Sequence, residues 1–311
     1  MLRLGKDGWQ AVISEEFTFD NVKKVATAVA VYLINNDLWK KPVVVGYDAR
    51  FLSEKVADLL VRVLQETGGS FYLVDRDTPL PVVDWEIKDR GASCALMVTA
   101  GSLPAQYSGI KLLPGAALAA KKNVLDIDRY LYLSALTTMA SNPDPAQLAY
   151  LSGLNQFNKS NVAKSRLERF DPRERYLKYA GSLVDKNAVK KAGLKVVVDP
   201  MFGSGRGYLD RALQQLGCQV EEIRNYRDVL FGGGAPDPVE ANLSELKAKM
   251  AENKADLGFA LSGDAGEFAL ITGDGRYFPA AHFAGYQAAG SLLACLRLVE
   301  LAARKGLKAL L

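Results

Sequence analysis

The sequence of 311 residues contains one histidine and three cysteines, and no two cysteines form a C-x-x-C pair. This scarcity excludes zinc and dithiol redox sites built on closely spaced ligands. Cys94, Cys218 and Cys295 lie far apart in apolar runs, which predicts buried, reduced thiols in a cytoplasmic protein. No apolar run reaches the ~18 residues of a membrane-spanning helix. Residues 1–7 also lack the apolar core of a signal peptide.

Basic charge is not concentrated in any part of the chain. The net charge is +4, from 39 basic and 35 acidic residues that are interspersed along the sequence. Nucleic-acid binders gather Lys and Arg on one element, so this pattern predicts no nucleic-acid partner. The length is typical of two domains, and the balance of apolar and charged residues is that of an ordinary globular protein.

Helical and strand patterns alternate along the chain. Apolar spacing predicts helices at residues 21–35, 53–67, 82–90, 207–216 and 243–253. Continuous apolar runs predict strands at residues 42–46, 71–74, 92–98, 195–200, 219–223 and 256–261. Ser53 is predicted as the N-cap of its helix. The alternation predicts α/β units with largely parallel sheets covered on both faces, and binding loops at the carboxyl ends of the strands.

The most informative stretch, residues 99–111, reads TAGSLPAQYSGIK. It resembles the phosphoserine loop of the α-D-phosphohexomutases, the phosphoglucomutase and phosphomannomutase superfamily, whose pattern is T-A-S-H-N-P-x-x-Y-N-G-I-K. The matching positions are Thr99, Ala100, Pro104, Tyr107, Gly109, Ile110 and Lys111. Gly101 stands at the family's phosphorylated serine, and Ser102 and Leu103 stand at the following His and Asn. Glycine has no oxygen to phosphorylate, so the resemblance implies the loop without its nucleophile.

Three further motifs extend the resemblance. Residues 5–11, 43–50 and 197–205 (GKDGWQA, VVVGYDAR and VVDPMFGSG) look like the family's G-T-D-G-W-R-A, V-V-x-G-Y-D-x-R and V-V-D-P-M-H-G-A-G. The resemblance implies two tandem phosphohexomutase-type α/β/α domains with mixed, mostly parallel sheets. The expected division is domain I at 1–136, a linker or helical insertion at 137–170, domain II at 171–281, and a C-terminal helical segment at 282–311 that begins a missing third domain.

The family's metal loop, D-G-D-A-D-R, corresponds to residues 262–267, which read SGDAGE. Ser262, Asp264 and Gly266 occupy the three ligand positions, so two of the three carboxylates are absent. Mg²⁺ dehydrates reluctantly and prefers several carboxylate oxygens. The family's Mg²⁺ is therefore not expected as a cofactor here.

The groups that handle phosphate in the family are also changed. The opening-loop arginine aligns with Gln10, and the metal-loop arginine aligns with Glu267; Lys6 stands where the opening motif has threonine. Lys111 retains the family's lysine, so weak sugar-phosphate binding remains an expectation. Ser102 lies one position from the serine site, where its side chain should point elsewhere, and we interpret it as a loop hydroxyl.

The predicted function is a catalytically inactive, truncated mutase homologue that acts in binding, scaffolding or regulation. The alternative is an enzyme, a divergent phosphohexomutase that uses Ser102 or a partner chain to isomerise hexose phosphates. A third interpretation is nucleotide binding by the glycines of residues 203–207. Residues 286–303 carry an apolar stripe at helical spacing. We expect this stripe to be buried, either by packing back on the second domain or by a second chain, and we favour the second chain, as a homodimer or a full-length mutase.

Overall fold

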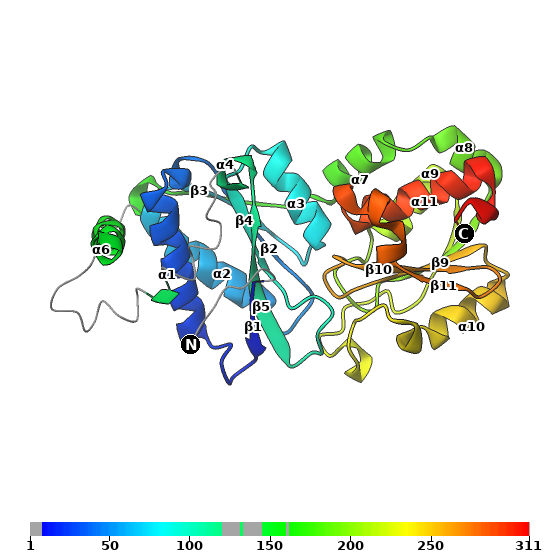
Figure 1. The fold of residues 1–311 in the computed structure, drawn as a ribbon, viewed down its shortest axis with the longest axis horizontal. Coiled ribbons are helices and arrows are strands. Elements are labelled where there is room, and N and C mark those ends of the chain that lie inside the picture. Colours follow the sequence, from blue (N-terminus) through cyan, green and yellow to red (C-terminus); the bar gives the residue numbers. More distant parts are fainter. Residues whose placement is uncertain (1–7, 120–130, 133–144, 160–161, 311) are drawn as a thin grey trace.

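The computed structural model describes residues 8–119, 131–132, 145–159 and 162–310. These residues form two α/β units side by side, each built around one sheet (Figure 1). The strand orders are β1-β5-β4-β2-β3-β6 in the first unit and β11-β10-β9-β7-β8 in the second. No helix in the described part of the chain is long and apolar enough to cross a membrane.

The first sheet combines a parallel part with an antiparallel edge. Its strands are β1 (Trp9–Val12), β2 (Val43–Tyr47), β3 (Ser70–Val74), β4 (Cys94–Val98), β5 (Tyr107–Pro114) and β6 (Arg166–Phe170). Strands β4, β2, β3 and β6 run parallel, whereas β1 and β5 pair antiparallel. Strand β6 corrects the predicted domain division, because it belongs to the first sheet although it falls within the predicted connection at 137–170. Its largely exposed, charged sequence has no apolar run that would have indicated a strand.

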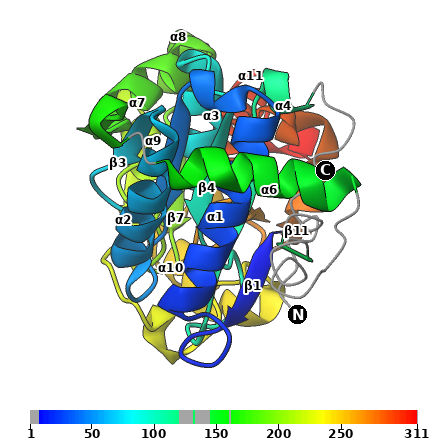
Figure 2. The same ribbon diagram turned by 90° about the vertical axis from the view of Figure 1, so that its left-hand side faces the viewer.

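Helices cover the first sheet on both faces. They are α1 (Phe19–Asn35), α2 (Ser53–Leu64), α3 (Leu80–Asp89), α4 (Ala116–Ala119) and α6 (Pro145–Asn158), with short 3-10 turns at Leu38–Lys40, Gln65–Thr67 and Val162–Lys164. Val43 and Val45 pack with α1 and α2, whereas Val44 packs with α3 on the other face. This alternation follows from the period of two along a strand. Helix α6 crosses α1 on the outside (Figure 2).

The start of α2 differs from the sequence prediction. Ser53 is the first helical residue, and the cap position is Leu52, in a left-handed conformation at φ 59°. The Ser53 hydroxyl donates to Asp48 Oδ1 at 3.0 Å instead of accepting from the helix backbone. The hydroxyl therefore anchors the turn after β2, which contains residues of the site described below.

The second sheet is also mixed. Its strands are β7 (Lys195–Asp199), β8 (Gln219–Glu222), β9 (Leu257–Leu261), β10 (Phe268–Thr272) and β11 (Tyr277–Pro279). Its helices are α7 (Arg173–Ser182), α8 (Lys186–Ala192), α9 (Leu209–Leu216), α10 (Ser244–Asn253) and α11 (Ser291–Lys305), with 3-10 turns at Phe231–Gly233, Glu240–Asn242, Ala280–Ala289 and Leu307–Leu310. Helix α10 packs on one face of the sheet, whereas α9 and α11 pack on the other.

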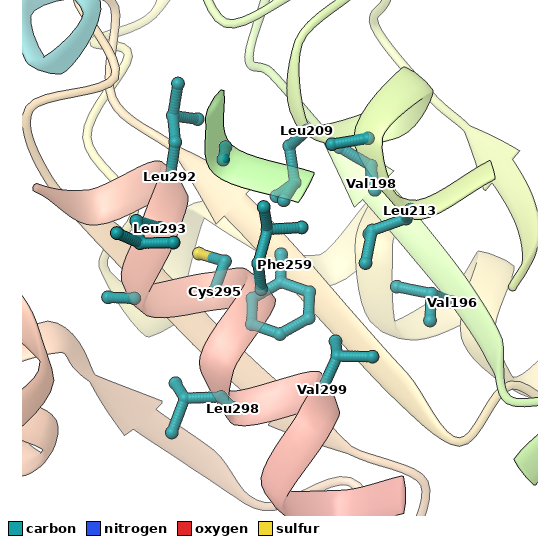
Figure 3. Close-up of a cluster of buried hydrophobic side chains, with 14 of the residues drawn as sticks. Val196, Val198, Leu209, Leu213, Phe259, Leu292, Leu293, Cys295, Leu298 and Val299 are labelled. Atoms are coloured by element: carbon teal, nitrogen blue, oxygen red, sulfur yellow. The ribbon is translucent and has the colours of Figure 1, made fainter. Parts of the chain in front are cut away.

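Helix α11 corrects the expectation drawn from its apolar stripe. Leu292, Leu296 and Val299 are at most 2% exposed and belong to the same core cluster as Phe259 of β9 and Leu213 of α9. Figure 3 shows this helix lying across the second sheet with its apolar side chains directed at that core. The chain's own second domain covers the stripe, so the stripe gives no reason to place a second chain at residues 286–303.

Candidate functional site

Two loops from different domains meet at the candidate site. The β4–β5 loop, residues 99–106, joins two antiparallel strands of the first sheet, and the β9–β10 loop, residues 262–267, does the same in the second. A Cβ atom on Gly263 would lie only 2.9 Å from the carbonyl oxygen of Gly101, so glycine allows the two backbones to touch. The Leu80 amide also donates to the Asp264 carbonyl at 2.8 Å.

A fully buried arginine sets the shape of the β4–β5 loop. Arg50 is 0% exposed. Its Nη atoms donate to four backbone carbonyls of the loop at 2.7–3.0 Å, those of Gly101, Leu103, Pro104 and Tyr107. Its Nε donates to Asp48 at 3.1 Å, so all five guanidinium donors are used. Sequence analysis placed Arg50 in a family motif but assigned it no role.

Asp48 supplies the negative charge beside Arg50. This carboxylate is also 0% exposed and accepts from the Arg50 amide at 3.1 Å in addition to the guanidinium. Burial raises the pKa of Asp48, and the Arg50 charge opposes that rise. Because the pair is shielded from solvent, it holds the loop only while both partners are present.

Gly101 faces the other groups of the site. Its φ is +59°, which glycine adopts readily, and its amide donates to Thr99 Oγ1 at 2.9 Å. A Cβ atom here would lie 3.4 Å from Lys111 Nζ and 3.8 Å from Asp264 Oδ2. A side chain at position 101 would therefore point at this lysine and this carboxylate. Because glycine has no side chain, no side-chain oxygen lies between Gly101, Lys111 and Asp264.

Asp264 is the charged centre of the β9–β10 loop. Its Oδ2 accepts from Thr99 Oγ1 at 3.1 Å and from Lys111 Nζ at 3.3 Å. Its Oδ1 accepts from Ser262 Oγ at 3.2 Å and from the Gly266 amide at 2.9 Å. Burial alone would raise the pKa of Asp264, but the Lys111 charge and these hydrogen bonds outweigh it and lower the pKa below its usual value.

The residues present do not fit the family's metal. Gly266 has no side-chain oxygen and its amide donates to Asp264, as does the Ser262 hydroxyl, so the two oxygens of Asp264 already have four donors. Across the described ranges, no group of three or more His, Cys, Asp or Glu side chains is arranged to hold a metal ion. A hard divalent cation requires several free oxygen ligands. Lys111 supplies the positive charge next to Asp264 instead.

Ser102 and Glu267 form a contact that the sequence did not reveal. The Ser102 hydroxyl donates to Glu267 Oε2 at 3.2 Å, across 165 positions of sequence. Glu267 is exposed and Ser102 is half-buried. Nothing in the sequence indicates this contact, because positions 102 and 267 lie in different domains.

The remaining predicted residues contribute less. Gln10 is on β1, paired with Gly109 of β5, and a Cβ atom on Gly109 would lie 2.9 Å from its Cγ. Lys6 lies outside the described residues. His282 is exposed and packs beside the rings of Phe278 and Phe283 rather than in the site.

Two arginines of the second domain tie the domains together around the site. Arg206 Nη2 donates to Asp77 at 2.6 Å, and both side chains are 11% exposed. Arg227 donates to the Ala49 carbonyl at 3.2 Å and to Glu54 at 3.2 Å. The Arg227 contacts reach the turn after β2, next to Arg50, so this part of the domain contact is continuous with the loop scaffold.

Comparison with protein families agrees with this geometry. The description "Phosphoglucomutase/phosphomannomutase, alpha/beta/alpha domain I" matches residues 1–128, and the corresponding domain II matches residues 174–275. The chain belongs to the phosphoglucomutase/phosphomannomutase family. The two tandem α/β/α domains expected from the sequence motifs are thereby confirmed.

Individual relatives and structures support the same assignment. The chain is 29% identical over 273 residues to a phosphoglucomutase/phosphomannomutase of Thermococcus kodakarensis, covering 88% of this chain and 56% of that protein. It is also 29% identical to a probable phosphoglucosamine mutase of Methanosphaera stadtmanae, covering 88% of this chain and 55% of that protein. The crystal structure of a putative phosphomannomutase from Thermus thermophilus superposes with a TM-score of 0.68 at 24% identity, covering 89% and 58% of the two chains. The chain thus spans little more than half the length of these relatives.

Proposed function

We propose that this chain is a non-catalytic member of the phosphohexomutase family that acts in binding, scaffolding or regulation. The observation that carries the proposal is the geometry at position 101. Gly101 has no side-chain oxygen, and its nearest side-chain neighbours, Lys111 and Asp264, pair with each other at 3.3 Å. Phosphoryl transfer through an enzyme residue needs an oxygen nucleophile and positive charge around the transferred group. Both requirements are poorly met by these residues.

Any sugar-phosphate binding at this site should be weak. The Lys111 ammonium is shared with Asp264, and Glu267 adds a second carboxylate at the loop contact. Two carboxylates against one ammonium repel a phosphate dianion at close range. We therefore propose that the site contributes a fixed contact between the domains and that a protein partner is the functional ligand.

The direct test is incubation of the chain with glucose 1,6-bisphosphate and Mg²⁺, followed by measurement of the intact mass. The expected result is an unmodified chain, because residue 101 offers no acceptor. A stoichiometric gain of one phosphoryl group would overturn the proposal. Peptide mapping, with Ser102→Ala as the matched variant, would then identify the acceptor.

The Ser102–Glu267 hydrogen bond favours a second candidate function. A hydroxyl beside a carboxylate that can take its proton is the arrangement of an activated nucleophile. This candidate is a divergent phosphohexomutase acting on hexose phosphates, with a partner chain completing the site. It requires conversion of glucose 1-phosphate to glucose 6-phosphate that is lost in both Ser102→Ala and Glu267→Gln. The first proposal expects no conversion by any of the three proteins.

We also propose a cytoplasmic location, which the cysteines support. All three are unpaired and buried. Burial raises the pKa of Cys94 to about 12 and that of Cys218 to about 11. The thiols therefore stay protonated and unreactive. Fractionation of the native cell would test this location.

A further inference from the structure

A groove lies on the outer face of the first domain between α1 and α2, and Phe157 and Asn158 at the end of α6 also line it. Figure 2 views this face. The groove has a volume of about 1020 Å³, and its walls include Phe19 and Lys23 of α1 and Lys55, Leu59, Arg62 and Val63 of α2. None of these residues belongs to the two loops of the candidate site, so the groove is a separate feature of the chain.

The residues of α2 that line the groove are arranged as in a helix-binding site. Lys55, Leu59, Arg62 and Val63 follow one another at helical spacing, so they share one side of α2. From Lys55 to Arg62 they extend over roughly 11 Å, about two helical turns. A trough between two helices, with an apolar floor and polar rims, is the surface that amphipathic helices bind.

The apolar part of this surface is exposed to solvent. Phe19 is 46% exposed and Phe51 is 52% exposed, and both line a smaller pocket of about 180 Å³ that shares Phe19 and Leu52 with the groove. Leu59, at 8% exposed, lies deeper in the floor. Large apolar side chains gathered at the mouth of a groove mark an interaction surface.

The charge of the groove indicates which partner fits. Its lining contains Lys23, Lys55 and Arg62 but a single acid, Glu66. Lys23 pairs with Asp20 at 3.2 Å, so the positive charge rests on Lys55 and Arg62. The other acids of α2 are taken up elsewhere, because Glu54 pairs with Arg227 and Asp58 pairs with Arg169. Among the described residues, no carboxylate lies within ion-pair distance of Lys55 or Arg62, and both are exposed. The groove is therefore basic as well as apolar.

We propose that this groove docks an acidic amphipathic helix of a partner protein. Apolar residues of the partner helix pack on Leu59, Val63 and Phe19, and its carboxylates pair with Lys55 and Arg62. A second copy of this chain is disfavoured as the occupant, because the chain carries a net charge of +4. The proposal goes beyond the proposed function, since it does not depend on whether the loop site is catalytic.

Peptide selection on the immobilised full chain tests the proposal. The probe is a phage-displayed library of peptides of about 16 residues, long enough for a helix of roughly 24 Å. Enriched peptides should carry acidic residues beside apolar residues at helical spacing. Fluorescence anisotropy should then show binding that weakens about tenfold or more in Lys55→Glu/Arg62→Glu. Phe19→Ser, at an exposed position, should weaken binding without reversing charge.

The matched control is Lys178→Glu/Lys186→Glu, which changes the net charge equally at exposed positions of α7 and α8. It should bind the selected peptide like the unmodified chain. A peptide whose acids are replaced by lysine should bind Lys55→Glu/Arg62→Glu better than the unmodified chain. Circular dichroism confirms that each variant is folded.

Three results would overturn the proposal. The first is enrichment of no peptide, or of peptides without acidic residues. The second is an equal loss of binding in the control variant, which would reduce the effect to net charge. The third is a dimer detected by light scattering that Phe19→Ser dissociates, which would assign the groove to a second copy of the chain.

Discussion

The two loops that meet between the domains are held in different ways. The β4–β5 loop is bound through its backbone carbonyls by Arg50 of its own domain. The β9–β10 loop presents Asp264, and two of its four donors, Thr99 and Lys111, come from the other domain. The shape of the first loop is thus a property of one domain, whereas the charge of the second depends on the contact between domains. The backbone contacts therefore hold the first loop independently of the side chains that it carries.

The largest effect is expected from Arg50→Met. The change leaves the buried Asp48 carboxylate without its neutralising charge and four carbonyls without their donor, which should cost about 3–5 kcal/mol of the free energy of unfolding. Urea denaturation measures this loss, with exposed Arg62→Met as the control that should change stability by less than about 0.5 kcal/mol. Equal stability of the two variants would show that the loop does not need Arg50.

Lys111→Met tests the dependence of the second loop on the first domain. Asp264 keeps three donors but loses its neutralising charge, so we expect a loss of roughly 1.5–3 kcal/mol. Lys111→Met/Asp264→Asn should recover much of this loss, because no buried charge then remains. Additive effects of the two changes in a double-mutant cycle would contradict the pairing.

The same variant should change the pH dependence of stability. The folded-state pKa of Asp264 is lowered, so its contribution is present above the ordinary pKa of an aspartate and is lost as pH falls through the lower folded value. Lys111→Met removes the main cause of the lowering. With burial then raising the folded-state pKa of Asp264, this group no longer loses stability on acidification. The stability deficit of the variant relative to the unmodified chain should therefore be largest near neutral pH and shrink as pH falls, and thermal melts across the acidic range would show this. Parallel curves for the two proteins would argue against the role of Lys111.

Gly101→Ser should have a smaller effect. A side chain at a φ of +59° costs about 1 kcal/mol, and Gly101→Ala should cost the same. The new hydroxyl faces Lys111 and Asp264, yet we expect no phosphorylation by glucose 1,6-bisphosphate because the cation ligands are still absent. Appearance of a phosphorylated Gly101→Ser protein by mass spectrometry would show that only the nucleophile had been lost.

The smallest effect is expected from Mg²⁺. Millimolar Mg²⁺ should leave the Tm unchanged, because a ligand stabilises only a fold that binds it. Ser262→Asp/Gly266→Asp should produce a Mg²⁺-dependent rise in Tm, although a Cβ atom at Gly266 would lie 3.0 Å from Asp264 Oδ1. A rise with the unmodified chain would reveal a metal site that the geometry at Asp264 does not provide.

The parallel strands β2, β3, β4, β7, β8 and β9 and the helices α1, α2, α3, α9 and α10 follow closely from the sequence, whereas the antiparallel strands β1, β5, β10 and β11 are not among the predicted elements. Val43, Val44 and Val45 predict β2 because a strand covered on both faces needs an apolar residue at every position. The β4–β5 loop is predictable through its motif. Strand β6 is not predictable from the sequence, because it is an exposed edge strand without an apolar pattern. Its backbone pairing with β3 stabilises it instead.

Contacts between distant segments explain most of the rest. Helical spacing in α11 shows that one face is apolar but not which surface covers it, and the second domain does so. Ser53 is a residue type typical of an N-cap, yet its hydroxyl donates to Asp48 instead of accepting from the helix backbone. The Ser102–Glu267 hydrogen bond requires both domains in place. Each of these depends on a partner that local sequence patterns do not identify.

The carbonyl contacts of Arg50 have a consequence for how this loop tolerates mutation. Every amino acid carries a backbone carbonyl, so the arginine can hold the same loop whatever side chains occupy positions 102, 103 and 106. Residues at these positions can be exchanged, by natural drift or in a designed library, without disturbing the chain beneath them. The β4–β5 loop is therefore a position at which side chains that bind a new ligand can be selected while the fold stays the same.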